Sequence, residues 1–288
     1  MKLEHLNIFW KEAVLFVLTQ ILGIFVAVRL SRVLELTEIK PQPVSFFNIL
    51  IYFLIITLFS LAVLKISKKG SGIMLQIFFI LALFSGLDIL FGTFIGEPGA
   101  IILAVALIVF RFSKPTILIH NLVIVGGLAG IGGMLGLTLF PRDVIILLII
   151  LAVYDAIAVY KTKHMVKMAQ EMIKKRVILG IIVPEKIMGF RASMIDVEHD
   201  KIPARRIFKP GERVKFMILG GGDLALPLLL IASVAHRNIL HSIIILIFSL
   251  FGLLAMNLIF IKLKSRPMPA LPPLAFFSIL GYLVSLLV

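Results

Sequence analysis

The chain has 288 residues, of which 60% are hydrophobic, a mean hydropathy of +1.12 and a formal net charge of +14. This composition is too apolar for a soluble domain, which must cover its core with polar surface, and it indicates an integral membrane protein. There is no cysteine, so disulfides, thiolate catalysis and thiolate-bound zinc or iron–sulfur clusters are excluded. We expect neither a metal nor a cofactor.

Nine apolar segments are candidates for membrane spans, because a spanning helix needs about 20 mostly apolar residues. The first is expected to be retained rather than cleaved as a signal peptide, since Lys11 and Glu12 adjoin it, no small-residue cleavage site is evident and further spans follow. The predicted fold is therefore all-α with nine transmembrane helices. The segments are 13–30, 45–66, 72–94, 98–112, 116–140, 143–160, 214–236, 238–261 and 270–288.

One polar segment, 161–213, separates the sixth span from the seventh. We therefore divide a single membrane domain into helices one to six at 1–160, a loop at 161–213 and helices seven to nine at 214–288. The loop is rich in Lys and Arg, which is typical of a solvated segment that contacts anionic lipid. Stretches near its two ends, Ile178–Val183 and Arg206–Phe208, favour extended structure and are candidates for short strands.

The basic residues are unequally divided between the two sides of the nine-span arrangement. The N-terminus and the loops after the even-numbered spans hold 24 of the 29 Lys and Arg. The positive-inside rule then places the N-terminus and the 161–213 loop in the cytoplasm and the C-terminus outside a cell membrane crossed many times. Since these charges lie in loops between apolar spans, we expect the lipid bilayer rather than nucleic acid as the partner.

Three acidic residues, Asp88, Asp155 and Asp223, lie well inside predicted spans, whereas Glu12 and others lie near span ends and can reach the headgroups. An ionisable side chain at the centre of a bilayer costs roughly 2.5–3.5 kcal/mol on insertion scales and marks a functional site by default. Asp155 lies about 8 Å from the cytoplasmic end of its span and Asp223 about 14 Å, at 1.5 Å per residue. These two carboxyls therefore fall in the same half of the bilayer on consecutive spans.

Two carboxyl groups in contact at low dielectric cannot both be ionised, so they share one proton. The ionised group accepts a proton from water as the water attacks an amide carbon, while the protonated group donates to the carbonyl oxygen. Such a pair hydrolyses peptide bonds without a metal or a nucleophilic side chain. We predict that Asp155 and Asp223 are this pair; for either residue alone, a hydrogen bond between packed helices is the alternative.

Glycines and prolines flank this pair. Gly220, Gly221 and Gly222 precede Asp223, and such a run exposes the backbone and loosens a helix, although close helix packing is the alternative. At the start of the ninth span, four prolines surround Ala270–Leu271 and predict a stiff, non-helical turn, for which simple helix capping is the alternative.

Together these elements resemble the signature of the presenilin and signal-peptide-peptidase family of GxGD intramembrane aspartyl proteases. That signature is Tyr-Asp in the sixth span, Gly-x-Gly-Asp in the seventh and Pro-Ala-Leu before the ninth. Here the corresponding residues are Tyr154-Asp155, Gly220-Gly221-Gly222-Asp223 and Pro269-Ala270-Leu271, in the same order and on the expected spans.

The resemblance implies a presenilin-like fold that cleaves transmembrane helices of membrane proteins or signal peptides. It also implies that Asp155 and Asp223 are catalytic and that Tyr154, Gly220, Gly221, Gly222, Pro269, Ala270 and Leu271 shape the site and hold substrate. The 161–213 loop is much shorter than that of animal presenilins, which indicates a compact prokaryotic homologue of archaeal type. Homo-oligomerisation and cleavage of the chain within its own loop are left open.

Two alternatives remain from the sequence. A transporter or cation channel that uses intramembrane carboxylates accounts for Asp88 as well, but not for the glycine run or the Pro-Ala-Leu turn. A prepilin-peptidase-like protease also carries Gly-x-Gly-Asp, yet it normally has fewer spans and does not need the Pro-Ala-Leu turn. Because a helical substrate must be unwound before cleavage, we also expect a small sheet of cytoplasmic-side segments to hold it, with Arg206–Phe208 as one strand.

Overall fold

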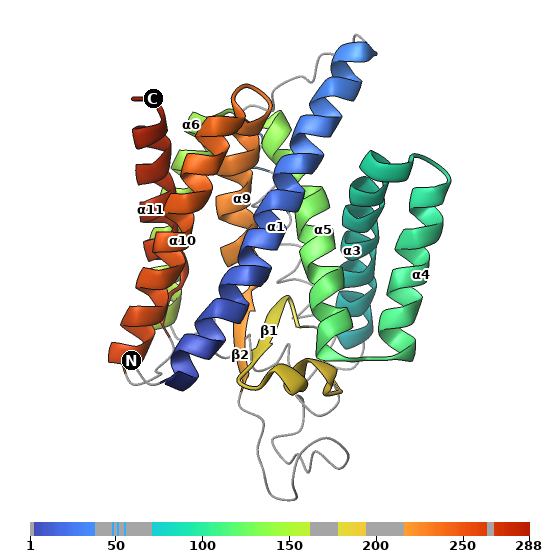
Figure 1. Cartoon of the computed structure of the whole chain (residues 1–288), viewed down its shortest axis with the longest axis horizontal. Coiled ribbons are helices and arrows are strands. Elements are labelled where there is room, and N and C mark those ends of the chain that lie inside the picture. Colours follow the sequence, from blue (N-terminus) through green and yellow to red (C-terminus); the bar gives the residue numbers. More distant parts are fainter. Residues whose placement is uncertain are drawn as a thin grey trace, which may run out of the picture.

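The computed structural model describes residues 3–37, 48, 51, 55, 71–161, 178–193, 216–263 and 268–288. Its helices stand side by side as a bundle, and α1 crosses the bundle obliquely between a group formed by α9, α10 and α11 and a group formed by α3, α4 and α5 (Figure 1). The helices in these ranges are α1 (Leu3–Leu36), α3 (Ser71–Ile95), α4 (Gly99–Ser113), α5 (Ile117–Thr138), α6 (Pro141–Tyr160), α9 (Gly221–Ala235), α10 (Ile239–Lys262) and α11 (Leu271–Ser285).

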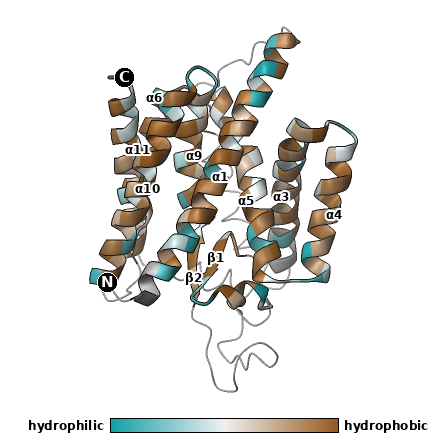
Figure 2. Ribbon diagram, viewed as in Figure 1, coloured by the Kyte–Doolittle hydropathy of each residue, from teal (hydrophilic) through white to brown (hydrophobic). Residues whose placement is uncertain are grey.

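Five of these helices, α1, α3, α5, α6 and α10, are long and apolar enough to cross a membrane, and α4, α9 and α11 are shorter apolar helices. Hydrophobic residues run along the middle of the helices, while hydrophilic ones gather near the ends and the sheet (Figure 2). Outward-facing side chains such as Val153, Ile247 and Phe276 are large, apolar and exposed, as expected where lipid replaces water. The prediction of a multi-pass membrane protein is confirmed; most of the predicted span 45–66 lies outside the described residues.

The predicted seventh span, 214–236, is not a continuous helix, and the all-α prediction is wrong at this point. Its first part forms strand β2 (Phe216–Gly220), and helix α9 begins only at Gly221. β2 pairs antiparallel with β1 (Gly180–Pro184), with Gly180 opposite Gly220 and Pro184 opposite Phe216. Glycine is a poor helix former, so the glycine run at the end of β2 keeps the helix from beginning earlier. The backbone hydrogen bonds between β2 and β1 favour the extended form of residues 216–220.

The expectation of a strand near one end of the polar segment is met, and the other end is not tested. Ile178–Val183 overlaps β1, which continues into a short 3₁₀ helix at Ile187–Arg191. Arg206–Phe208 lies outside the described residues. The described partner of β1 is instead β2, which sequence periodicity assigned to a membrane helix.

Close helix packing depends on glycine in α5. A Cβ atom on Gly130 would lie 1.8 Å from the carbonyl oxygen of Gly86 in α3, and one on Gly136 would lie 2.4 Å from Ala232 in α9. No side chain fits at these positions. α5 therefore packs closely against α9 and α3, and α9, the helix that carries Asp223, is buried along most of its length.

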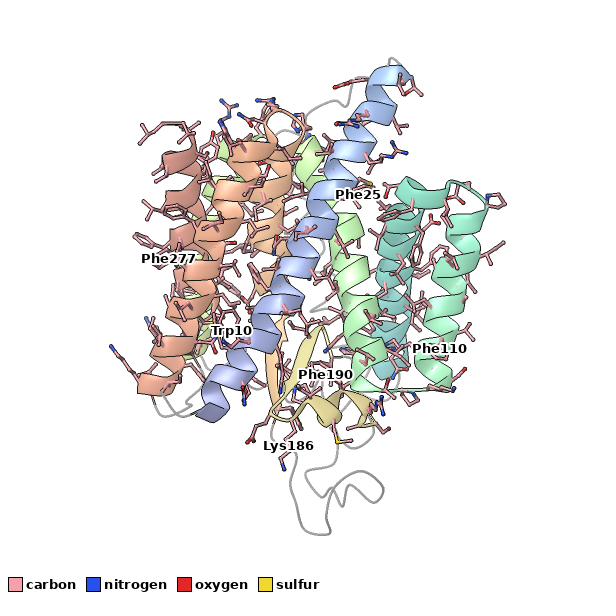
Figure 3. The ribbon with its side chains drawn as sticks, in the orientation of Figure 1. Trp10, Phe25, Phe110, Lys186, Phe190 and Phe277 are labelled. Carbon is pink, nitrogen blue, oxygen red and sulfur yellow. The ribbon has the colours of Figure 1, made fainter. Side chains whose placement is uncertain are left out.

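The sheet and the start of α1 occupy the same end of the bundle. Lys11 Nζ of α1 donates hydrogen bonds to the carbonyl oxygens of Pro184 (3.0 Å) and Glu185. Lys186 and Phe190, which follow β1, lie at this end (Figure 3), whereas α11 ends at the opposite one (Figure 1). The start of α1, β1 and the short helix after it thus lie at one end of the bundle, and α11 ends at the other.

Candidate active site

Asp155 lies in the last turns of α6 and has only 5% of its side chain exposed. Its Oδ2 accepts a hydrogen bond from the backbone N–H of Leu271, the first residue of α11, at 3.2 Å, and the backbone of Ala270 also interacts with it. The next two residues, Pro272 and Pro273, have no N–H to offer. The backbone N–H groups at the start of α11 that have no partner within the helix are therefore the ones that face Asp155. The positive end of the helix dipole of α11 also favours a negative charge on Asp155.

Asp223 is the third residue of α9, and its carboxylate bonds back to the backbone of Gly220, the residue that caps the helix. This is the arrangement of an acidic residue in a capping box, in which the side chain satisfies a free N–H at the helix start. One turn on, Pro227 lacks the N–H that the carbonyl of Asp223 would accept in a regular helix. Gln20 Nε2 of α1 donates to the neighbouring carbonyl of Leu224 at 3.1 Å.

The two carboxyls belong to one site. α6, α9 and α11 pack against one another, and Asp155 is the acid whose charge acts on Asp223. Pro269 is buried beside the turn that leads into Leu271. The fold thus brings Asp155, Asp223, the glycine run and the Pro269–Leu271 turn together, although they come from three separate parts of the chain.

The three glycines before Asp223 are not equivalent. A Cβ atom on Gly220 would lie 2.9 Å from Asp223 Oδ2, and one on Gly221 would lie 3.1 Å from the carbonyl oxygen of Leu179, to which Gly221 N–H donates at 2.7 Å. A Cβ atom on Gly222 would meet nothing within 4 Å. Absence of a side chain therefore matters at Gly220 and Gly221, while the Cβ position of Gly222 is open.

Two residues named in the sequence analysis do not lie with the Asp155–Asp223 pair. Tyr154 has 58% of its side chain exposed, so its ring and the buried carboxyl of Asp155 leave α6 on different sides. Asp88 lies on α3, which packs against α1, α4 and α5 rather than α6. Its Oδ1 is buried without a hydrogen-bond partner among the residues described. Its place in the fold separates Asp88 from the Asp155–Asp223 pair.

The outer edge of β1 is closed by polar side chains from two helices. Asn121 of α5 bonds to both backbone groups of Ile182, donating to the carbonyl at 2.7 Å and accepting from the N–H at 2.8 Å. His120 Nε2 lies 2.9 Å from the carbonyl oxygen of Gly180, and Lys11 bonds to that of Pro184. Every second residue of β1 is held in this way, which fixes the strand against α5 and α1.

These contacts show which way the sheet faces. Because the backbone groups of Ile182 point to Asn121, the ladder bonds to β2 are made by the alternate residues, Ile181 and Val183. The same alternation in β2 directs the backbone groups of Phe216 and Ile218 away from β1. In the part of the chain that the structure describes, no group bonds to the backbone of Ile218 on that side. The edge next to Asp223 is therefore the open edge of the sheet.

An apolar cavity of about 110 Å³ adjoins this region. It lies between α3, α5 and the start of α9, and its lining includes Phe79, Leu83, Leu128, Leu179 and Gly221. Such a space suits an aliphatic side chain rather than a charged one. Within the described residues, no group of three or more His, Asp or Glu could hold a metal ion.

Sequence reasoning missed Gly180, Asn121 and Glu12. A Cβ atom on Gly180 would lie 2.2 Å from the carbonyl oxygen of Leu219, so the strand pairing needs glycine there. Glu12 was expected to reach the headgroups, which is wrong: it is fully buried, and its Oε2 accepts from Asn257 Nδ2 at 2.7 Å. The sequence feature that could have identified Glu12 and Asn121 is a polar residue within an apolar segment. Asn257, the partner of Glu12, has the same feature.

Comparisons with known proteins give one family match and two structures of similar fold. The family model for signal-peptide peptidase and presenilin aspartyl protease matches residues 13–288. Two solved structures of a presenilin family intramembrane aspartate protease, in different space groups, are similar to this chain with TM-scores of 0.60 each. They are 23% and 24% identical in sequence, and the alignments cover 94% and 96% of both chains. No curated protein sequence matches significantly.

Proposed function

Because the chain belongs to the signal-peptide peptidase and presenilin family of aspartyl proteases, we propose that Asp155 and Asp223 are its catalytic carboxyls and that it cuts peptide bonds inside the membrane. The observation that carries this proposal is the shared site at which Asp155 meets the start of α11 beside Asp223. Both carboxyls lie at helix N-termini, where a negative charge is stabilised without a metal.

The reaction uses one proton shared by the two carboxyls. The ionised member takes a proton from a water molecule, which attacks the carbon of the scissile amide, while the protonated member donates to the carbonyl oxygen. The carboxyl group that has received the water proton then passes it to the departing amine as the carbon–nitrogen bond breaks. The other carboxylate takes back a proton from a hydroxyl of the tetrahedral intermediate, so the pair again holds one proton. Since a coupled pair titrates as a unit, the roles are assigned to the pair rather than to one residue.

The substrate must lose its helical structure near the cut, because a helical amide is shielded and already hydrogen-bonded. The open edge of β2 offers backbone donors and acceptors at alternate residues, next to Asp223. We infer that a substrate strand C-terminal to the cut adds to this edge, in the manner of strand addition.

N-methylation of the substrate tests strand addition directly. A series of single-span substrates, each with one N-methyl amino acid C-terminal to the cut, should be cleaved with an alternating loss. Positions that donate to β2 should lose roughly tenfold or more, since a hydrogen bond contributes about 0.5–1.5 kcal/mol and a methyl group adds a clash. The intervening positions should be cleaved almost normally. Uniform sensitivity along the series would contradict strand addition.

Cleavage itself separates this function from transport. Protein purified in detergent, incubated with a single-span reporter, should give products whose masses place the cut within the span. A transporter or channel would leave the reporter intact, and neither the family match nor the described fold favours that alternative. The position of the cut should also lie toward the substrate end that faces the sheet.

We also propose that the sheet end of the bundle faces the cytoplasm, as the distribution of basic residues indicates. The absence of native cysteine makes this simple to test. A single cysteine in place of Ile187, beside the sheet, or Leu287, at the other end, provides one exposed thiol each. In intact cells, a membrane-impermeant maleimide should label Leu287→Cys and spare Ile187→Cys; the reverse pattern would invert the orientation.

A further inference from the structure

Glycine predominates where the sheet meets the start of α9. Gly180 begins β1, Gly220 ends β2 opposite it, and Gly221 and Gly222 begin the helix. Glycine restrains the backbone less than any other residue, and it offers no side chain that could pack against a neighbour. The position of Asp223, whose carboxylate bonds back to Gly220, therefore depends on the backbone hydrogen bonds made at this level.

Two consecutive carbonyl groups, those of Leu179 and Gly180, join this region to its surroundings. The carbonyl of Leu179 accepts from the N–H of Gly221 at 2.7 Å, and that of Gly180 lies 2.9 Å from Nε2 of His120, which is fully buried in α5. In an extended strand the backbone groups of alternate residues face opposite ways. The imidazole of His120 therefore holds the strand from one side, and the strand holds the first residue of α9 on the other.

Arg111 of α4 determines which nitrogen of His120 carries the hydrogen. Its Nε and Nη2 lie 3.4 and 3.3 Å from His120 Nδ1. A guanidinium group has only donors, so Nδ1 must accept, and the ring hydrogen is on Nε2, which faces the carbonyl of Gly180. The Cζ of Arg111 also lies 5.2 Å from the ring centre of Phe79 and 5.3 Å from that of Phe112, and these contacts keep the guanidinium in place.

The three side chains that bond to the outer edge of β1 are thus not equivalent. Asn121 bonds to Ile182 and Lys11 to Pro184, which pair with the middle and the beginning of β2. The bond from His120 is made at the end of β2, where α9 begins. Loss of the bonds from Asn121 or Lys11 weakens the strand, whereas loss of the bond from His120 releases the segment next to the helix start.

We propose that His120, held in one tautomer by Arg111, is a positioning residue of the aspartyl pair. It fixes Gly180 and, through the preceding carbonyl, the first turn of α9, so that Asp223 keeps its place in the site. The inference rests on the proposed assignment of the two catalytic aspartates. It adds a polar residue of α4 and one of α5 to the groups on which the reaction depends.

The kinetic test replaces His120 with leucine or with glutamine in the purified full chain. Leucine removes the donor to Gly180, whereas the side-chain amide of glutamine can still donate to that carbonyl. On the single-span reporter, kcat of His120→Leu should fall about tenfold, between the few-fold effect of one hydrogen bond and the roughly hundredfold cost of displacing a catalytic group by about 1 Å. KM should stay nearly unchanged, and His120→Gln should recover most of the lost kcat.

Asn121→Leu is the matched control, because it removes two bonds to the same strand and so weakens β1 at least as much. Melting curves in detergent identify a temperature at which every variant is folded, and all rates are compared there. Asn121→Leu should keep a kcat close to that of the wild type. An unchanged kcat in His120→Leu, or equal losses in His120→Leu and Asn121→Leu, would overturn the proposal.

The tautomer of His120 provides a readout that does not depend on activity. In protein labelled with ¹⁵N-histidine, the signals that are missing from His120→Gln should show a protonated Nε2 and an unprotonated Nδ1 at neutral pH. Arg111→Met should lose this preference and also lower kcat, whereas Arg111→Lys keeps a donor and should retain both. A protonated Nδ1 in the wild type, or a normal kcat in Arg111→Met, would contradict the role of Arg111. If Asp155→Asn or Asp223→Asn were active, the proposed function would fail instead, and the tautomer would be unaffected.

Discussion

Asp155 and Asp223 both meet the N-terminus of a helix, yet the two regions that hold them are built differently. Asp223 lies at the start of its own helix and bonds back to Gly220, three residues away. Asp155 lies near the end of α6 and depends on Leu271, more than a hundred residues later. One carboxyl is therefore supported by local sequence and the other by tertiary structure, so that different substitutions should disturb each.

The largest effect is expected from removing either carboxyl. Asp155→Asn and Asp223→Asn should each abolish cleavage of the reporter, because an amide keeps the size but cannot share the proton. Both variants should also lose labelling by a hydroxyl-bearing mimic of the transition state while keeping the thermal stability of the wild type. Near-normal turnover by either variant would remove that residue from the pair.

The local support of Asp223 is tested by Gly220→Ala, with Gly222→Ala as its matched control. The new methyl group at 220 would lie 2.9 Å from Asp223 Oδ2 and must displace it, whereas the one at 222 meets nothing within 4 Å. We expect kcat to fall by about 10²-fold for Gly220→Ala, as for a misplaced catalytic group, and to change little for Gly222→Ala. Equal effects of the two substitutions would show that the steric difference between the glycines is irrelevant.

The tertiary support of Asp155 is tested by Leu271→Pro against Leu271→Ala. Proline removes the N–H that bonds to Asp155, while alanine keeps it and removes only the side chain. A hydrogen bond to a charged group contributes about 1.5–3 kcal/mol, so kcat should fall by roughly tenfold to a hundredfold for proline. The same drop in both variants would assign the effect to packing of the leucine.

The sheet that precedes Asp223 should show mainly a loss of stability. Asn121→Leu removes both bonds to Ile182 and leaves its backbone groups buried without partners. Each unsatisfied group costs about 1–3 kcal/mol, so the melting temperature in detergent should fall by several degrees. Leu122→Ala, next in sequence but exposed, serves as the control. An unchanged melting temperature for Asn121→Leu would mean that β1 does not need this anchor.

The smallest effect is expected from Asp88→Asn. Asp88 lies on α3, outside the group of helices that meet at the pair, and the substitution keeps its size and hydrogen-bonding capacity. Turnover of the reporter should remain within about twofold of the wild type, since changes that keep side-chain size and lie away from a site cost little. A large loss of turnover would indicate that Asp88 also takes part in the reaction.

The helices that cross the membrane could be predicted because apolar length is a local property. The predicted segments 72–94, 116–140 and 238–261 differ from α3, α5 and α10 by one or two residues at each end. The strand β2 could not be predicted in this way, because Phe216–Gly220 is as apolar as a membrane helix. Its extended form depends on β1, which lies more than thirty residues away and is held by Asn121 and Lys11.

The sequence by itself determined that the chain is a membrane protein, that Asp88, Asp155 and Asp223 stand within apolar segments, and that a glycine run precedes Asp223. These are consequences of residue type and spacing within single segments. Only the tertiary structure decided that β2 is a strand, that a Cβ atom would be crowded at Gly220 but not at Gly222, and that Glu12 is fully buried and bonded to Asn257 instead of lying at the headgroups. Each of these depends on contacts between segments distant in sequence, which no local pattern of residues encodes.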